Sequence, residues 1–388
     1  MRHTSHLTKA PLALPLCTMT RKLVVAFFSV LSLVTGTASH VYHIPAAVGN
    51  DSSAALFTSA AADLDGAKIR PVNATAYDWW YFDVVSTDPD SLASVVVVFY
   101  TATPGGFPFL PPSDSVTVAQ IFVSFPNGTT FNATANADDA TVITDNNVSS
   151  GEWVGSGLSW NHTGFNYAVV VDAPDIGVQG TISFNPIAPA HYPCGPAEAG
   201  QNMQVGPGIG WSNAIPDAVS SIELTVGGTL LSFTGAGYHD KNWSNQPFTS
   251  NVGSWYWGHG RLGPYSFVWF DYLALDGTEF VSGYAAKYGT IISASCESGS
   301  ISVRPTGKNA IFPPVLSTGN PSGYHITFNL EQAGTLEMDV SVLGILVDSA
   351  PYTRFVGNIS GVIVPAGNST PRNVLQGTAL YEQFKLTN

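Results

Sequence analysis

Charged residues are scarce in this sequence of 388 residues: Asp, Glu, Lys and Arg together make up 11% of it, against about a quarter in ordinary soluble proteins. No run of Lys or Arg occurs, and the formal net charge is −13. Proteins that bind nucleic acids or anionic membranes need basic patches that displace counterions from phosphate groups. The composition therefore excludes nucleic acid as a partner and is that of a folded globular protein.

Long apolar segments are few as well. One such run, residues 23–34, follows Arg21 and Lys22 and precedes Gly36-Thr37-Ala38. A basic start, a short apolar stretch and small residues at the end are typical of a secretory signal peptide. The run is too short to span a bilayer, and no later segment is longer. We predict that residues 1–38 are a leader, that the mature chain begins near Ser39 in the secretory pathway or outside the cell, and that no membrane span is present.

Cysteine is rare too. The chain has three cysteines, and Cys17 falls in the predicted leader. In an oxidising compartment Cys194 and Cys296 can form one disulfide that closes a long loop; two buried free thiols are the alternative. No Cys and His spacing typical of zinc occurs, so no metal site is predicted.

So little charge requires another source of solubility, and Asn-x-Ser/Thr sequons supply one. The sequence contains nine sequons. One of them, at Asn242, lies inside an aromatic motif, where we expect it to be buried and unmodified. The other eight are predicted glycosylation sites: Asn50, Asn73, Asn127, Asn132, Asn147, Asn161, Asn358 and Asn368.

Helical periodicity is nearly absent, whereas short alternating or β-branched segments separated by turn residues recur throughout. Examples are Tyr77–Val85, Ser94–Thr101 and Ser254–Arg261. Many strands at this spacing indicate an all-β protein made of antiparallel barrels or sandwiches. The length suggests two successive β domains, residues 39–215 and 216–388, with the Pro- and Gly-rich segment 186–217 as the crossover between them.

The most informative stretch is residues 237–243, Gly-Tyr-His-Asp-Lys-Asn-Trp, followed by residues 254–261, Ser-Trp-Tyr-Trp-Gly-His-Gly-Arg. Four of the nine tryptophans lie between Tyr238 and Asp271. Aromatic and ionisable side chains that alternate along strands indicate polar groups pointing into an enclosed apolar space. A packed barrel core whose histidines and carboxylates pair with each other is the alternative interpretation.

These motifs, with Asp-Trp-Trp-Tyr-Phe-Asp at residues 78–83 and Trp-Phe-Asp-Tyr at residues 269–272, resemble the AttH/carotenoid-hydratase-like (CrtC-like) superfamily. Within it the sequence is most similar to the fungal Diels–Alderases. The resemblance implies two tandem lipocalin-like antiparallel β-barrels and a cofactor-free pericyclase of secondary metabolism that catalyses a [4+2] cycloaddition. The leader and the sequons depart from the decalin-forming members, which favours a separate branch, for example one that performs an intermolecular hetero-Diels–Alder reaction.

A cycloaddition requires two π systems held in register and a hydrogen-bond donor that lowers the energy of the acceptor. We expect the catalytic donors to be His239, Lys241 and Tyr256. The residues predicted to bind substrate, a polyene or quinone-methide-like apolar molecule, are Asp78, Trp80, Phe82, Trp243, Trp257, His259, Trp269 and Asp271.

Side-chain alternation leaves open which face of the first aromatic strand lines the cavity. Asp78, Trp80 and Phe82 share one face, and Trp79, Tyr81 and Asp83 share the other. We expect one enclosed cavity near the junction of the two halves. Two other functions fit the same pocket: hydration or isomerisation of a polyene by a protonating acid, and transport of an apolar molecule without catalysis. A secreted glycosidase fits less well, because Glu is scarce in the aromatic motifs.

Overall fold

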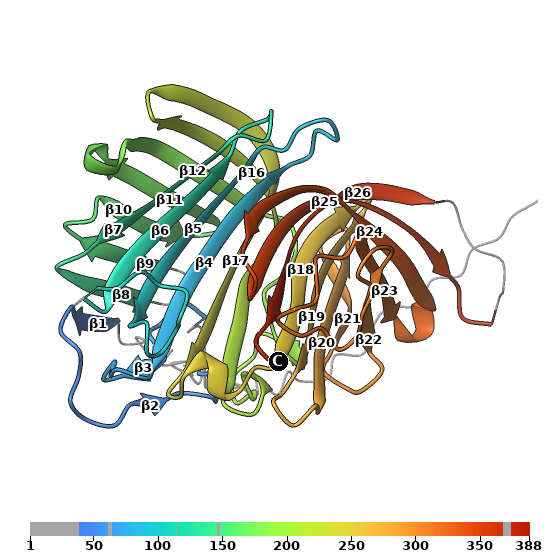
Figure 1. Cartoon of the computed structure of the whole chain (residues 1–388), viewed down its shortest axis with the longest axis horizontal. Helices are drawn as coiled ribbons and strands as arrows, with labels where there is room; N and C mark the ends of the chain where they lie inside the picture. The colour runs from blue at the N-terminus through green and yellow to red at the C-terminus, as the bar shows by residue number, and fades with distance from the viewer. Residues whose placement is uncertain (1–38, 61–63, 114, 146–147, 368–373) are drawn as a thin grey trace, which may run out of the picture. The chain divides into compact units, whose positions relative to one another are not determined.

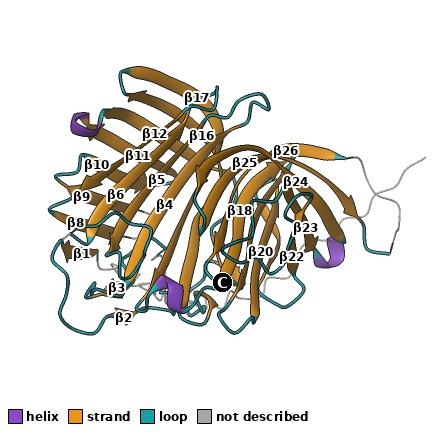
Figure 2. Cartoon of the chain, in the orientation of Figure 1, coloured by secondary structure: helices purple, strands orange, loops and turns teal. Residues whose placement is uncertain are grey.

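The computed structural model describes residues 39–388 except 61–63, 114, 146–147 and 368–373, and the predicted leader lies outside these residues. Most of the described chain is strand, and its helices are three 3-10 turns: η1 (Pro174–Ile176), η2 (Phe248–Ser250) and η3 (Glu331–Ala333). Figure 2 shows this dominance of strands. The prediction of an all-β fold is confirmed. Among the described residues no helix has the length and hydrophobicity that crossing a bilayer requires.

The first sheet has fifteen antiparallel strands. Twelve follow the order β1-β8-β9-β10-β11-β12-β16-β17-β4-β5-β6-β7; β13 and β15 pair with β16, and β14 pairs with β13. Figure 1 shows it in blue to yellow-green. A two-stranded sheet of β2 (Ala54–Ala55) and β3 (Ile69–Arg70) lies outside it. The strands of the first sheet are β1 (His40–Pro45), β4 (Tyr77–Ser86), β5 (Ser94–Ala102), β6 (Thr117–Ser124), β7 (Thr130–Asn136), β8 (Asp139–Asp145), β9 (Val148–Val154), β10 (Leu158–Thr163), β11 (Asn166–Ala173), β12 (Val178–Pro186), β13 (His191–Tyr192), β14 (Gly195–Pro196), β15 (Gln204–Gly206), β16 (Ile209–Val226) and β17 (Thr229–Ser244).

The first sheet curls around its own apolar core. Strands β4 and β9 are far apart in the strand order, yet the rings of Trp80 and Trp153 lie 5.2 Å apart, edge to face. Phe82 of β4 also packs 5.8 Å from Phe184 of β12. Because neighbouring strands twist, a wide sheet bends until its apolar face covers itself. This face of β4 is therefore used for the core.

The second sheet has nine antiparallel strands in the order β21-β20-β19-β18-β26-β25-β24-β23-β22. It also curls, since Phe267 of β19 packs 5.2 Å from Phe328 of β23. Figure 1 draws it in yellow to red. Its strands are β18 (Ser254–Leu262), β19 (Tyr265–Leu273), β20 (Glu279–Lys287), β21 (Thr290–Ser295), β22 (Ile301–Thr306), β23 (Gly323–Asn329), β24 (Thr335–Asp348), β25 (Tyr352–Val364) and β26 (Leu375–Lys385).

The sheets divide at a different place from the boundary drawn at residues 215 and 216. Strand β16 runs through that position without interruption, and the change of sheet falls between β17 and β18. The Pro- and Gly-rich segment contains β13, β14 and β15, of which β13 and β15 pair with β16. It folds back onto the first sheet instead of leading to the second. The partition into two domains stays a prediction.

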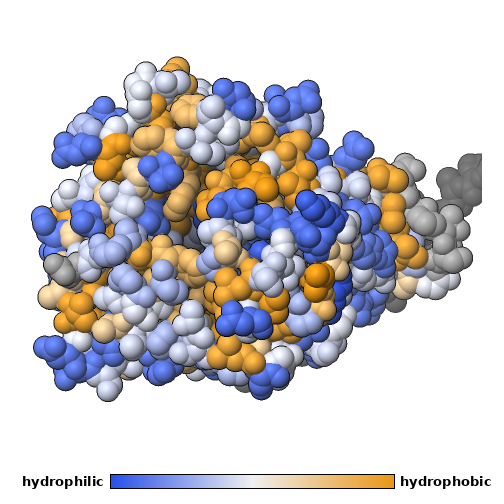
Figure 3. Space-filling view, viewed as in Figure 1, coloured by the Kyte–Doolittle hydropathy of each residue, from blue (hydrophilic) through white to orange (hydrophobic). Residues whose placement is uncertain are grey.

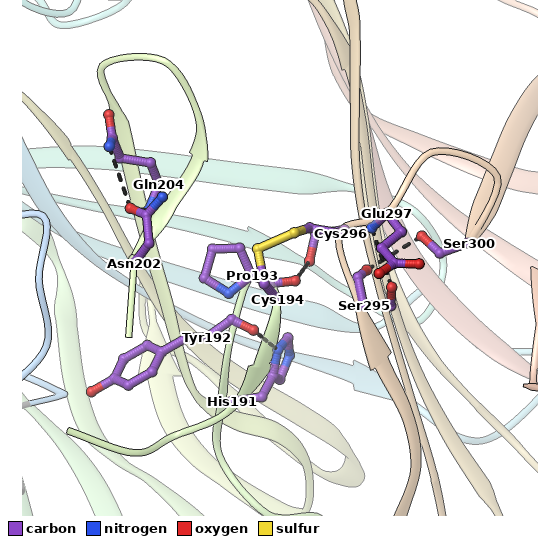
Figure 4. Close-up of a disulfide and its surroundings, with 11 residues drawn as sticks. His191, Tyr192, Pro193, Cys194, Asn202, Gln204, Ser295, Cys296, Glu297 and Ser300 are labelled. Atoms are coloured by element: carbon purple, nitrogen blue, oxygen red, sulfur yellow. Dashed lines mark hydrogen bonds between the residues drawn. A yellow bond between two sulfur atoms is a disulfide. The ribbon is translucent and has the colours of Figure 1, made fainter. Parts of the chain in front are cut away.

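Cys194 and Cys296 form a disulfide across 102 residues of sequence. Cys194 lies between β13 and β14 of the first sheet, and Cys296 follows β21 of the second. Figure 4 shows the bond between these two segments. Of the two alternatives left open by the sequence, the structure has the disulfide, and it joins the two sheets covalently.

Candidate active site

A cavity of about 220 Å³ lies between the two sheets. On one side, Asp240, Tyr81, Val98 and Gln120 are register partners across β17, β4, β5 and β6. On the other, Trp257, Glu382, Arg354 and Val347 are partners across β18, β26, β25 and β24. Partners across a sheet point to the same face. The complete lining is Trp79, Tyr81, Val98, Tyr100, Phe107, Phe109, Gln120, Phe122, Asp240, Asn242, Trp255, Trp257, Val347, Ser349, Tyr352, Arg354, Glu382 and Phe384.

Aromatic rings make up much of this wall and contact one another closely. Trp79 lies 4.8 Å from Phe107, and Trp255 lies 4.8 Å from Phe384, measured between ring centroids. Figure 3 shows a hollow near the middle of one face with hydrophobic residues around it, in the region where Figure 1 draws β4 to β6 beside β25. An enclosed cavity near the junction of the two halves was expected from the sequence; the structure has a cavity there that is partly open to the surface.

Asp240 is the carboxyl group in the half of the wall that the first sheet supplies. It is 3% exposed, and its Oδ2 accepts hydrogen bonds of 2.8 Å from Trp211 Nε1 and from the Tyr238 hydroxyl. Burial raises the pKa of Asp240 to about 8, although these two hydrogen bonds oppose the rise. Both bonds end on Oδ2, which leaves Oδ1 to carry a proton. At neutral pH the cavity wall therefore contains a protonated carboxylic acid.

An ion pair lies in the opposite half of the wall. Arg354 Nε donates a 3.0 Å hydrogen bond to Glu382 Oε1, and the Tyr352 hydroxyl donates one of 2.6 Å to the same oxygen. Burial raises the pKa of Glu382, and the charge of Arg354 opposes that rise. The Arg354 guanidinium also lies 4.9 Å from the centroid of the Phe122 ring. Charge, hydrogen bonds and ring contacts together hold both side chains in place.

Several buried donors around the cavity have no hydrogen-bond partner in the part of the chain that the structure describes. They include the Tyr81 hydroxyl, Trp255 Nε1 and Arg354 Nη1. A buried donor without a partner costs about 1–3 kcal/mol. Three such groups on residues that line one cavity indicate a site built for a molecule that carries acceptor atoms.

The predicted donors His239 and Lys241 lie on the other face of β17, inside the first sheet. His239 stacks on Phe82 with 3.8 Å between ring centroids, and its Nε2 lies 3.1 Å from Asp65 Oδ1. This contact holds the pKa of Asp65 below its ordinary value even though Asp65 is buried. His239 is therefore part of a packed polar network, and its predicted catalytic role remains a prediction.

Lys241, on the same face of β17, is held by an ion pair and by an aromatic ring. Its Nζ donates a 2.5 Å hydrogen bond to Asp78 Oδ1 and lies 3.2 Å from the centroid of the Trp80 ring. Burial lowers the pKa of Lys241 to about 8 against the pull of Asp78. Trp243 Nε1 also donates to a backbone oxygen, at Leu56. Asp78, Trp80, Phe82 and Trp243 thus belong to the interior of the first sheet, and none of them lines the cavity.

Tyr256, Trp269 and Asp271 lie in the interior of the second sheet. Asp271 Oδ2 accepts hydrogen bonds from the Val303 backbone and from Arg304 Nη1, and burial raises the pKa of Asp271 to about 7. The Tyr256 ring lies 4.9 Å from Tyr324. These three side chains face away from the cavity because they alternate with Trp255, Trp257 and Phe270 along β18 and β19.

Of the predicted site residues, Trp257 lines the cavity and His259 lies behind it. His259 Nε2 lies 2.8 Å from Asp83 Oδ1, and the His259 ring stacks on Tyr238 at 4.6 Å. Asn242 is 4% exposed and lines the cavity, so the expected burial of this sequon is confirmed.

Sequence reasoning missed Asp240, Arg354 and Glu382 as site residues. Asp240 lies inside the motif of residues 237–243, but it alternates with His239 and Lys241, the two residues of this strand that were expected to be donors. Arg354 and Glu382 were not considered, although a charged residue that directly adjoins an apolar run is a signal. Arg354 is followed by Phe-Val-Gly, and Glu382 is preceded by Ala-Leu-Tyr.

A second cavity of about 380 Å³ borders the first. Phe122, Val347 and Arg354 line both cavities, and the second also includes Asn132, a predicted glycosylation site. Asn132 is exposed, as are Asn50 and Asn127, whereas Asn73, Asn161 and Asn358 are partly buried. Asn147 and Asn368 lie outside the described residues.

Two curled lipocalin-like sheets flank an aromatic cavity with a buried acid and an ion pair in its wall, an arrangement typical of a small-molecule site. Comparison with known proteins makes the class specific. The chain belongs to the Diels-Alderase-like family, whose model matches residues 40–342, and this confirms the resemblance to the fungal Diels–Alderase branch.

Two fungal relatives are named for the rearrangement of a quinolone epoxide and not for a Diels–Alder reaction. The quinolone epoxide rearrangement protein asqO of Emericella nidulans is 38% identical over 303 residues, which cover 77% of this chain and 82% of the relative. The quinolone epoxide rearrangement protein penF of Penicillium thymicola is 34% identical over 354 residues, or 89% and 96% of the two chains. The Diels-Alderase ucsH of Acremonium sp. is 26% identical over 248 residues, or 60% and 59%. The chain is therefore an enzyme of this family.

Solved structures show the same fold. The crystal structure of CghA with Sch210972 superimposes with a TM-score of 0.70 over 90% of this chain and 99% of that one, at 16% identity. An AttH-like protein of Nitrosomonas europaea gives a TM-score of 0.52 over 81% and 93%, at 15% identity. These likenesses confirm the lipocalin-like architecture.

Proposed function

We propose that the enzyme isomerises an epoxide carried by a quinolone-type molecule, with Asp240 as the general acid and without a cofactor. The observation that carries the proposal is the position of Asp240: a buried carboxyl group whose pKa is raised to about 8 lies in the wall of an aromatic cavity. An acid with a pKa near the working pH is suited to proton donation. The names of the two relatives at 38% and 34% identity support the substrate class.

The reaction is balanced within one molecule. The Asp240 carboxyl group gives its proton to the epoxide oxygen as one C–O bond breaks, and positive charge develops on the released carbon. An electron-rich group of the same substrate forms the new bond to that carbon, and the proton that this group loses returns to the Asp240 carboxylate. Product and substrate have the same composition, so the reaction consumes no co-reactant.

The aromatic wall suits this chemistry. A cation above the face of Trp, Tyr or Phe is stabilised by about 0.5–2 kcal/mol, more when water is excluded. Trp79, Trp255 and Trp257 supply such faces. The unpartnered donors of Tyr81 and Arg354 are available to hold oxygen atoms of the substrate.

A [4+2] cycloaddition, the activity expected from the sequence, is the second candidate. The name of the family and the Diels-Alderase relatives support it. In that reaction Tyr81 and Arg354 would donate to the carbonyl group of the dienophile, and a protonated Asp240 would not be required. The two candidates therefore differ in what replacement of Asp240 does.

The test uses the purified full chain with a quinolone that carries a side-chain epoxide and a neighbouring alkene. Conversion to an isomer of equal mass is followed by chromatography with mass detection against a protein-free reaction. We expect turnover well above the spontaneous rate for the wild type and a loss of about 10²–10⁴-fold in Asp240→Asn. Turnover that survives in Asp240→Asn, together with conversion of a linear diene–dienophile substrate, would favour the cycloaddition. Binding of the epoxide with no conversion above the spontaneous rate would indicate a carrier without catalytic activity.

A further inference from the structure

The Arg354–Glu382 ion pair does not use all of its hydrogen-bonding atoms. Within the described residues both hydrogen bonds to Glu382 end on Oε1, and none ends on Oε2. Arg354 uses Nε for this pair, and its buried Nη1 has no partner among the described residues. Both side chains line the cavity, and both are more than nine-tenths buried, at 4% and 7% exposure. The two residues that line the cavity on neighbouring strands thus supply one N–H donor, Arg354 Nη1, and one second carboxylate oxygen, Glu382 Oε2.

This pair is held rigidly. Arg354 and Glu382 are register partners on β25 and β26, so the backbone fixes their spacing. The guanidinium is packed near the rings of Phe122, Tyr81 and Tyr352, at 4.9, 5.7 and 5.6 Å from their centroids. A planar, charged fork held in this way recognises a planar partner with little loss of freedom on binding.

A secondary lactam presents the complementary edge: a carbonyl oxygen that accepts and an adjacent N–H that donates, both in one plane. We propose that Arg354 and Glu382 are the specificity-determining residues of the site, with Arg354 Nη1 donating to the lactam carbonyl and Glu382 Oε2 accepting the lactam N–H. This inference rests on the proposed function for the substrate class. It deepens that proposal by assigning the atoms that hold the heterocycle opposite Asp240.

Such a site rejects a ring that lacks the N–H, because the buried Glu382 oxygen then loses its partner. Aromatic packing alone would not discriminate in this way. The lactam hydrogen is therefore the feature to remove in an experiment, and it can be removed from the ligand without changing the protein.

The experiment measures the affinity of the purified full chain for 2-quinolone and for N-methyl-2-quinolone by isothermal titration calorimetry. 4-Methyl-2-quinolone, which carries its extra methyl group away from the lactam edge, controls for size. We expect 2-quinolone and the 4-methyl compound to bind about 10-fold or more tightly than the N-methyl compound, as for a hydrogen bond to a charged group. Equal affinities for all three compounds, or no binding up to about 1 mM, would overturn the proposal.

Variants assign the effect to the two residues. Glu382→Gln should reduce the discrimination between the N–H and N-methyl compounds to about 3-fold or less, because an amide is a weaker acceptor than a carboxylate. Arg354→Lys should weaken all three compounds about equally, because all keep the carbonyl group. Arg261→Lys is the matched control: Arg261 pairs with Asp217 away from the cavity, and its replacement should leave all affinities unchanged. Unaltered discrimination in Glu382→Gln contradicts the assignment.

The two proposals fail separately. Asp240→Asn is expected to keep the lactam discrimination while it loses turnover. Discrimination without epoxide turnover in the wild type would refute the proposed reaction and support the lactam site. Epoxide turnover without discrimination between the N–H and N-methyl compounds would support the proposed reaction and refute the lactam site.

Discussion

The hydroxyl group of Tyr238 donates a 2.8 Å hydrogen bond to Asp240, two residues further along β17. Their side chains share one face of the strand, and Trp211 donates to the same carboxylate oxygen from β16. These donors stabilise the ionised form of Asp240, whereas burial favours the protonated form. The balance sets the pKa of the proposed general acid.

Removal of the Tyr238 hydroxyl should therefore make Asp240 a weaker acid. In Tyr238→Phe one hydrogen bond to the carboxylate is lost, so the pKa of Asp240 should rise above its value of about 8. Activity requires the protonated acid, and the alkaline limb of the pH–rate profile should move to higher pH. The profile of kcat between pH 6 and 10 checks this. An unmoved or lowered limb would show that Asp240 is not the group that titrates.

Asp240 should also make stability depend on pH. Its pKa is raised from 3.8 to about 8 in the folded state, so between these values the folded protein holds a proton that the unfolded chain has released. The contribution of this group to the free energy of unfolding is complete below about pH 4 and is lost as the pH rises through 8. Melting temperatures of wild type and Asp240→Asn, measured from pH 4 to 9, should show the difference moving in favour of the variant as the pH rises. A pH-independent difference would contradict the raised pKa.

Lys241 is expected to act on stability. In Lys241→Ala the buried Asp78 carboxylate loses its ion-pair partner and keeps the hydrogen bond from the Lys68 backbone; loss of one partner of a buried ion pair typically costs about 3–5 kcal/mol. The double variant Asp78→Asn/Lys241→Met removes both charges and should regain part of this loss while it keeps turnover within about 3-fold of the wild type. Chemical denaturation and turnover of the folded variants check this. A stable but inactive double variant would instead support the catalytic role predicted for Lys241 from the sequence.

The disulfide should hold the two sheets together. It closes a loop of 102 residues, and a cross-link of that length stabilises a chain by about 2–5 kcal/mol. Cys194→Ser/Cys296→Ser should unfold at correspondingly lower denaturant concentration, and reducing agent should lower the stability of the wild type but not of the double variant. The double variant in reducing agent is the control for effects of the reagent itself. Equal stability of the wild type and the double variant would show that the bond contributes nothing.

Glycosylation is expected to follow exposure. In protein secreted from a eukaryotic host, Asn50, Asn127 and Asn132, which are exposed, should carry glycans, whereas Asn242, at 4% exposure, should not. Mass spectrometry of glycopeptides checks each site, and the same data locate the mature N-terminus that the sequence predicts near Ser39. A glycan on Asn242 would be incompatible with the packing of β17.

The sequence was sufficient for the strands, because alternation and β-branched runs are local signals. It was less reliable at tight turns. Residues 153–160 look like one strand, but the structure has β9 and β10 with a turn between them, where Gly155 and Gly157 adopt φ of 81° and 76°. A positive φ suits glycine, so this pair was a usable signal.

The sequence by itself determined which side chains share a face: Trp80 with Phe82, Tyr81 with Trp79, and His239 with Lys241. It also predicted an aromatic cavity with buried polar groups, with a packed barrel core as the alternative. Only the tertiary structure decided that Tyr81 and Asp240 face the cavity while Trp80 and Lys241 face the core. Both faces of β4 and β17 are buried: one packs inside the curled first sheet, and the other packs against the second sheet. Both faces are therefore rich in apolar residues. Alternation cannot rank two buried faces, and the partners that distinguish them, Arg354 and Glu382, lie more than one hundred residues away in the chain.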